Sequence, residues 1–166
     1  MACTLWWGGF SVRLMGDSSG VVAASSGTAI VVAVIMCALV AVWTVALVVV
    51  DVEQRRLPDA WTLPAAGVAL LTCVAMPVGV FGFIWPGAYL FSGRGIGGGD
   101  VKLAVPLGVA MALVGGAGAV LAAMLLASMF TVVTLLINKA KAMAHGPSML
   151  AAAWIVGFTS TFLTSI

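Results

Sequence analysis

Charged side chains are scarce in this sequence. Asp, Glu, Lys and Arg account for 7% of its 166 residues, against roughly a quarter in an average soluble domain. Hydrophobic residues account for 63%, and the mean hydropathy is +1.24. An ordinary soluble domain is therefore excluded. The composition predicts an integral membrane protein, and the length suits one domain of several helices.

Cysteine is also sparse, and its spacing carries no motif. Cys3, Cys37 and Cys73 lie far apart, with no CxxC pair, so neither a zinc site nor a disulfide framework is indicated. We interpret all three as small apolar packing residues, and we expect no metal and no cofactor. The net charge of +2 is too small to indicate a nucleic-acid partner.

The first 26 residues differ from the rest of the chain. Residues 1–26 mix tryptophans with charged and small residues, and we expect them to form an extension that does not span the membrane. A signal peptide is the alternative, but it begins with basic residues before an apolar core, and Met1–Gly9 contains no charge. Residues 27–166 form the predicted membrane domain.

Long apolar runs predict an all-α fold with about six transmembrane helices. Gly27–Val50 has no charged residue and, at about 1.5 Å per residue, is long enough to cross a hydrocarbon core of about 30 Å. The run Trp61–Phe91 divides into a hairpin if the chain turns near Met76–Gly79, as Pro77 and Gly79 favour. A single helix of about 45 Å is the alternative. The remaining spans follow from a break at Gly115, Gly116 and Gly118 and from a last segment, Ser148–Ile166.

Basic residues decide the predicted orientation. With the hairpin, all but Arg13 of the lysines and arginines lie on one side of the membrane: Arg55, Arg56, Arg94, Lys102, Lys139 and Lys141. The positive-inside rule assigns that side to the cytoplasm. Asp51 and Asp100 then meet at the cytoplasmic edge.

Those two acids are the candidate catalytic residues. Asp100 follows a stretch in which five of the seven residues from Gly93 to Gly99 are glycine, and an acid kept at the edge of lipid is a functional candidate. One ionised carboxylate could deprotonate water while the other, protonated, polarises a peptide carbonyl. The sequence leaves open which of them is the base. A solvated helix flank is the simpler interpretation of Asp51.

Three further features have plain structural interpretations. Pro58 disfavours helical geometry at Leu57, and Asp59 is predicted to cap the helix that begins near Ala60. Gly93–Gly98 fits GxGxxG, but no strand precedes it, so a dinucleotide site is not expected. His145 is interpreted as an ordinary linker residue.

The motifs resemble those of the type IV prepilin peptidases, membrane aspartic proteases marked by GxGD. The segment DVEQRRLPDAWT, residues 51–62, is similar to the family's first-aspartate motif, and the Gly-Pro before the last span is similar to one near the family's C-terminus. The flanking His145 and Ser148 depart from the family's common aromatic neighbours. The matching residues are Asp51, Leu57, Pro58, Asp59, Thr62, Gly97, Gly98, Gly99, Asp100, Val101, Lys102, Leu103, Gly146 and Pro147.

The resemblance implies an aspartic endopeptidase that removes the leader peptide of type IV prepilins at the cytoplasmic face of the cell membrane. Asp51 and Asp100 are then the catalytic pair, and the expected partners are the prepilin and the lipid bilayer. Larger members of the family carry a cysteine-bearing insert and also methylate the new N-terminus. This chain has no such insert, so it resembles the small peptidase-only forms, such as those serving Tad-type pili.

Two other functions remain open at this stage. A small membrane carrier or subunit could use the acids to bind a cation or proton, but a carrier needs them near mid-membrane, and here both stand at predicted helix ends. A presenilin-like intramembrane protease also uses GxGD, usually with a Tyr-Asp motif. The only tyrosine, Tyr89, is followed by Leu90.

Overall fold

The described part of the chain is helical. A computed structural model describes residues 19–54, 56–92, 97–138 and 144–164, with the backbone alone for 19–26, 163 and 164. Within these ranges no residue lies in a strand, and the all-α prediction is confirmed. The elements are the α-helices α1 (Ser19–Gln54), α2 (Asp59–Ala75), α3 (Ile84–Ser92), α4 (Gly98–Asn138) and α5 (Gly146–Thr164), and the 3-10 helix η1 (Pro77–Phe83).

The chain divides into two units, Met1–Val45 and Ala46–Ile166. In the first unit the structure describes α1 from Ser19 onward, so this helix begins eight residues before the predicted span. Trp6 and Trp7 lie outside the described residues. The second unit contains the last turns of α1, where the helix ends at Gln54, and all the later elements. It carries every candidate site residue.

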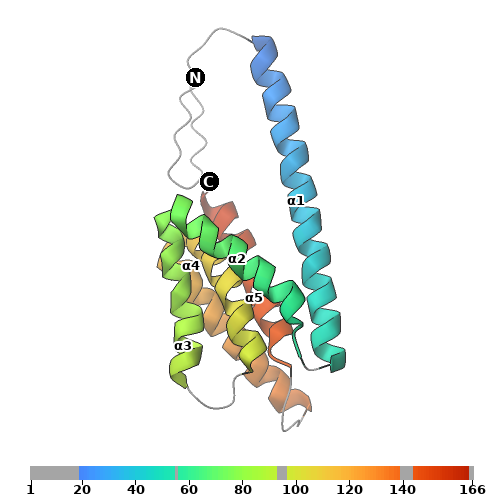
Figure 1. The fold of residues 1–166 in the computed structure, drawn as a ribbon, viewed down its shortest axis with the longest axis vertical. Coiled ribbons are helices and arrows are strands. Elements are labelled where there is room, and N and C mark those ends of the chain that lie inside the picture. Colours follow the sequence, from blue (N-terminus) through green and yellow to red (C-terminus); the bar gives the residue numbers. More distant parts are fainter. Residues whose placement is uncertain (1–18, 55, 93–96, 139–143, 165–166) are drawn as a thin grey trace. The chain divides into compact units, whose positions relative to one another are not determined.

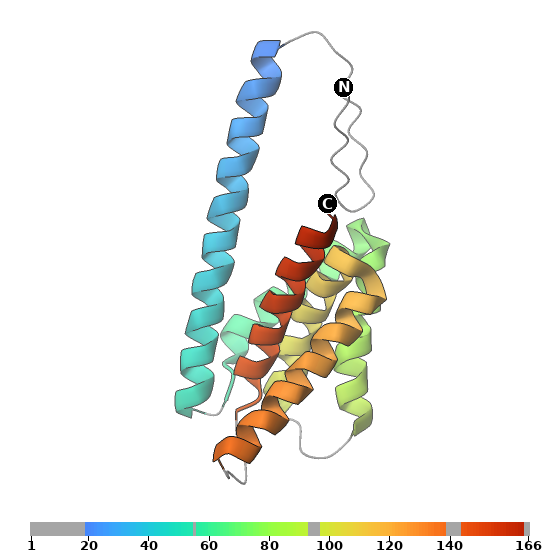
Figure 2. The same cartoon turned by 180° about the vertical axis from the view of Figure 1, so that it is seen from behind.

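The chain turns at both places where glycine and proline predicted a break. Helix α2 ends at Ala75, Met76 leaves helical geometry with φ −131° and ψ 89°, and Pro77 opens η1. The hairpin is therefore present, and the single long helix is excluded. Helix α4 is interrupted at Gly115 and Gly116, and Gly116 has φ +63°, a conformation that only glycine adopts readily. Figure 2 shows the two arms of α4 running side by side in opposite directions.

Helix α4 is the centre of the second unit. It contacts α2, η1, α3 and α5, and Figure 1 shows these elements gathered around it. Its crossing with η1 is very close, because a Cβ on Gly82 or Gly108 would overlap the backbone of the other segment. The largest fully buried side chains include Trp85, Leu103 and Met149. Glycine thus sets the helix spacing, and large apolar residues fill the remaining core.

The outer surface of the second unit is strongly apolar. Leu71, Phe91 and Leu125 are exposed by 72%, 94% and 73%, far more apolar surface than a soluble protein leaves in contact with water. Gly27–Gln54 is long and apolar enough to cross a membrane by length and composition, and so is Gly98–Asn138 taken as one segment, which the turn at Gly115–Gly116 divides into two arms. Together these features indicate a membrane protein. Six crossings remain a prediction.

One end of the second unit collects the polar motifs. The end of α1, the end of α3 and the starts of α2, α4 and α5 all lie there (Figures 1 and 2). The turn at η1 and the Gly115–Gly116 turn lie at the opposite end. Motifs far apart in the sequence therefore meet because each begins or ends a helix at the same end of the bundle.

Candidate active site

Asp51 is a buried acid on the last turn of α1. Its exposed fraction is 5%, whereas Val52, Glu53 and Gln54, which follow it, are exposed. The Gly146 N–H donates a hydrogen bond of 3.1 Å to its Oδ2. A solvated flank would face water like its neighbours. The interpretation of Asp51 as a solvated helix flank therefore does not fit its buried position.

Asp100 lies in the first turn of α4 and is partly buried. Its backbone N–H donates to the Gly97 carbonyl over 3.0 Å, and its carboxylate accepts a hydrogen bond from the Gly97 backbone. The N–H of Gly97, the residue before α4, has no hydrogen-bond partner within the helix. The Asp100 carboxylate supplies that partner. The glycine segment thereby fixes the carboxylate at the start of the helix. Gly93–Ile96 lie outside the described residues.

The two acids face a common site. Asp51 interacts electrostatically with Asp100, although 49 positions separate them in the sequence. Two carboxylates that interact in this way are not ionised together without a free-energy cost, and such a pair titrates as a unit. Among the described residues, no group of three or more His, Cys, Asp or Glu side chains could hold a metal ion. The two carboxyl groups can supply one base and one acid when one of them is ionised and the other protonated.

Gly99 joins the two aspartate motifs physically. A Cβ built on Gly99 would lie 3.1 Å from the Cβ of Leu57 and 3.5 Å from its backbone N, and Leu57 is buried. Gly98 has nothing within 4 Å of its Cβ position. None of Gly97, Gly98 and Gly99 has a positive φ. Of the three, Gly99 is the glycine that allows a close approach between the two motifs.

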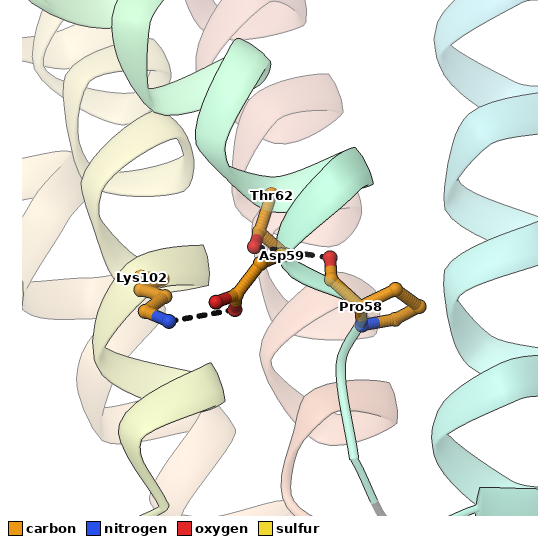
Figure 3. Close-up of polar contacts among 4 residues, drawn as sticks. All are labelled: Pro58, Asp59, Thr62 and Lys102. Carbon is orange, nitrogen blue, oxygen red and sulfur yellow. Dashed lines mark hydrogen bonds and ion pairs between the residues drawn. The ribbon is translucent and has the colours of Figure 1, made fainter.

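The prediction that Asp59 caps α2 is wrong. Pro58 is the N-cap residue, with φ −66° and ψ 129° and no side-chain cap, and Asp59 is the first residue of the helix. Figure 3 shows the Asp59 carboxylate turned toward Lys102, whose Nζ lies 2.6 Å from Oδ1. Buried Thr62 donates to the Pro58 carbonyl over 3.2 Å. Pro58 fixes the extended entry to the helix, which leaves the Asp59 side chain available for an ion pair across to α4.

Gly146 and Pro147 open α5 beside Asp51. The N–H of Gly146 belongs to the first turn, where helical N–H groups have no partner in the helix, and the Asp51 carboxylate accepts it. Pro147 has no N–H and fits the first turn of a helix for that reason. A Cβ on Gly146 would overlap the Asp51 carboxylate. Glycine is therefore the residue type that lets α5 begin against this acid.

His145 has partners that the sequence did not indicate. Its Nε2 lies 2.7 Å from the Tyr89 hydroxyl and its Nδ1 lies 2.6 Å from Thr131 Oγ1. It also interacts electrostatically with Asp51. The interpretation of His145 as an ordinary linker residue is wrong. Its place directly before Gly146 was the available signal, but nothing in the sequence links it to Tyr89 or Thr131.

Both aspartates lie in a region of the chain that matches a known family. The model of the type IV leader peptidase family matches residues 38–136, which is more than half of the chain and includes both aspartates. The chain belongs to the type IV leader peptidase family. No curated protein and no solved structure matches it.

Membership in the type IV leader peptidase family implies a protease that acts on prepilins. The matched region contains the end of α1, α2, α3 and most of α4. Gly146 and Pro147 lie beyond it, yet the structure brings Gly146 into contact with Asp51. The site is thus completed by a segment outside the matched region.

In this leader peptidase, Gly99→Val should lower prepilin cleavage at least tenfold. The added side chain must displace Leu57, and overpacking of this kind costs about 1–3 kcal/mol. Such a displacement would separate the two aspartate motifs. Cleavage rates in membranes with equal amounts of inserted protein measure the effect. Gly98→Val is the matched control, because its side chain enters open space. Equal rates for Gly99→Val and the parent would show that the contact with Leu57 does not shape the site.

Proposed function

We propose that this protein is an aspartic endopeptidase that removes the leader peptide of type IV prepilins, with Asp51 and Asp100 as its catalytic pair. The observation that carries the proposal is the meeting of two acids at one end of the bundle, one of them buried and held by the Gly146 N–H. Family membership supplies the substrate class.

The proposed reaction needs only these two carboxylates and water. The ionised member of the pair takes a proton from water, and the resulting nucleophile attacks the scissile carbonyl. The protonated member donates a hydrogen bond to that carbonyl oxygen and stabilises the negative charge that develops on it. The carboxyl that took the proton from water then gives it to the leaving amine nitrogen as the C–N bond breaks. Both carboxyl groups thereby return to their starting protonation states.

We further propose that the prepilins are of the Tad type and that the site faces the cytoplasm. The three cysteines lie far apart and form no CxxC pair, which sets the chain apart from the larger family members with a cysteine-bearing insert. Six of the seven lysines and arginines are predicted from the sequence to lie on the side of the two aspartates, and a positive side is a cytoplasmic side. The prepilin and the lipid bilayer are the proposed partners.

Co-expression with candidate prepilins tests the proposed activity. Cleavage removes the leader, so the pilin should move faster in gel electrophoresis and begin at a single new N-terminal residue. Cells that carry the prepilin alone are the control for host peptidases. A Tad-type prepilin and a prepilin from a larger type IV system, compared side by side, decide the substrate class. No cleavage of either would contradict the proposed function.

Cysteine labelling tests the proposed six-span topology and its orientation. In a chain whose own cysteines are replaced by serine, Gln54→Cys and Asn138→Cys should resist an impermeant reagent applied from outside. Val80→Cys, in the turn at the opposite end and exposed by 56%, should react with it. Labelling in permeabilised cells is the positive control, because it shows that the reagent can react with each cysteine once it has access. Strong external labelling at Gln54 would reject the proposed orientation.

A further inference from the structure

A short polar chain connects three parts of the second unit next to the aspartates. It runs from Tyr89 on α3 through His145 to Thr131 on α4, over distances of 2.7 and 2.6 Å. The rings of Tyr89 and His145 are tilted, with centroids 5.7 Å apart. Tyr89 is buried, with 9% exposure. These are the only tyrosine and the only histidine in the sequence.

The hydrogen-bond pattern assigns the protons of this chain. The Thr131 hydroxyl donates to the Ala127 carbonyl over 3.0 Å, so its oxygen accepts from His145 Nδ1–H. His145 Nε2 is then the unprotonated nitrogen and accepts from the Tyr89 O–H. A neutral imidazole with the proton on Nδ1 satisfies every group, because each hydroxyl has one proton to give. Burial lowers the pKa of His145, and the Asp51 carboxylate opposes this effect, so the neutral form is the one expected at pH 7.

The polar chain reaches both catalytic acids. His145 immediately precedes Gly146, whose N–H donates to Asp51, and the His145 carbonyl accepts from Met149 N–H over 3.2 Å as α5 begins. At the other end, Tyr89 interacts electrostatically with Asp100. The Trp85 indole N–H, fully buried and without a hydrogen-bond partner among the described residues, lies near the Tyr89 hydroxyl.

We propose that Tyr89 and His145 are positioning residues for the aspartate pair, and that the Tyr89–His145–Thr131 chain holds the start of α5 so that the Gly146 N–H stays on Asp51. The proposal rests on the proposed function of Asp51 and Asp100. Neither Tyr89 nor His145 is assigned contact with the prepilin. Their action is on the geometry and protonation of the acids.

The proposal predicts a pH limit that belongs to His145. Among the described residues, the ionisable groups that face His145 are Tyr89 from α3 and Asp51 from α1, while α4 contributes the Thr131 hydroxyl. Protonation at Nε2 gives His145 two donors, so the Tyr89 hydroxyl must change from donor to acceptor and the proton arrangement of the chain is lost. Because its pKa lies below the ordinary value of about 6.5, the arrangement is fully present above that pH. It is lost as the pH falls through the lowered value.

Histidine-selective ¹⁵N labelling tests the arrangement without any cleavage assay. The full chain in lipid nanodiscs contains one histidine, so both imidazole nitrogen signals belong to His145. We expect the neutral Nδ1–H tautomer at pH 7. Asp51→Asn should lower the pKa of His145 further, since the carboxylate that raises it is gone, whereas Asp100→Asn should not lower it. A protonated imidazole or the Nε2–H tautomer at pH 7, or a titration unchanged by Asp51→Asn, would overturn the proposal.

Kinetics of the same variants test the positioning role. Tyr89→Phe should reduce kcat about tenfold, the equivalent of one net hydrogen bond, with KM unchanged. His145→Phe should reduce kcat by at least the same factor. His145→Gln keeps an acceptor for Tyr89 and should retain most of the rate at pH 7, while the acid-side step due to His145 disappears from its pH profile. Thr134→Val is the matched control for Thr131→Val, because among the described residues the Thr134 hydroxyl bonds helix carbonyls alone, those of Phe130 and Thr131.

The two sets of results separate this proposal from the proposed function. If the parent cleaves and Tyr89→Phe keeps the parent's kcat and pH profile, the positioning role is wrong. If the parent cleaves no prepilin, the proposed function fails, and the titration of His145 in the parent and in Asp51→Asn still decides whether the chain is coupled to Asp51. Melting temperatures of all variants identify any loss of rate that comes from unfolding.

Discussion

Asn in place of either Asp51 or Asp100 should abolish prepilin cleavage while the protein still inserts in the membrane. Asn has nearly the shape of Asp, and its carbonyl oxygen can still accept the Gly146 N–H at position 51. It cannot take or give a proton as the mechanism requires. Loss of a general acid or base lowers a reaction rate about 10²–10⁴-fold. We expect the loss of either Asp51 or Asp100 to lower the cleavage rate by a factor in the upper part of that range.

The control for these variants is Asp59→Asn, the same chemical change eight residues after Asp51. Its ion pair with Lys102 joins groups with exposed fractions of 59% and 39%, and exposed ion pairs contribute between nothing and about 1 kcal/mol. We expect cleavage within about twofold of the parent. Membrane fractions with equal amounts of each variant, assayed for pilin mobility over time, measure all three. Full cleavage by Asp51→Asn or Asp100→Asn would remove that residue from the mechanism.

Gly146→Ala should reduce kcat about a hundredfold with little loss of stability. The new methyl group overlaps the Asp51 carboxylate, and the carboxylate, as the end of a side chain, can move aside. The fold therefore survives, but the catalytic group leaves its place and loses the Gly146 N–H. Misplacement of a reacting group by about 1 Å can cost about 10²-fold.

Gly157→Ala is the matched control, since it makes the same change in the same helix. Its new methyl group meets only the Met111 Cε, at 3.4 Å, an ordinary contact with the end of a flexible side chain. We expect the cleavage rate of the parent and a melting temperature that is unchanged or slightly higher, because alanine favours a helix over glycine. If Gly146→Ala cleaved as fast as Gly157→Ala, the contact between α5 and Asp51 would have no part in catalysis.

The sequence determined the helices and the turns between them. Long uncharged runs predict membrane helices because a backbone in lipid must satisfy its own hydrogen bonds. Glycine and proline marked the breaks at Met76–Gly79 and Gly115–Gly116 correctly, because their backbone preferences act within a few residues. The placement of Asp51 and Asp100 at helix ends followed from the same local rules.

Only the tertiary structure decided which polar groups meet. The contact of Gly99 with Leu57, the bond from Gly146 to Asp51 and the chain through His145 each join helices that are distant in sequence. Even the local prediction for Asp59 failed, because Lys102 on another helix offered its carboxylate a partner. Local preferences fix where a helix begins and ends, but the partner of a side chain depends on how the helices pack. That packing is set by apolar contacts and by close glycine crossings such as Gly82 with Gly108, whose partners a single sequence does not reveal.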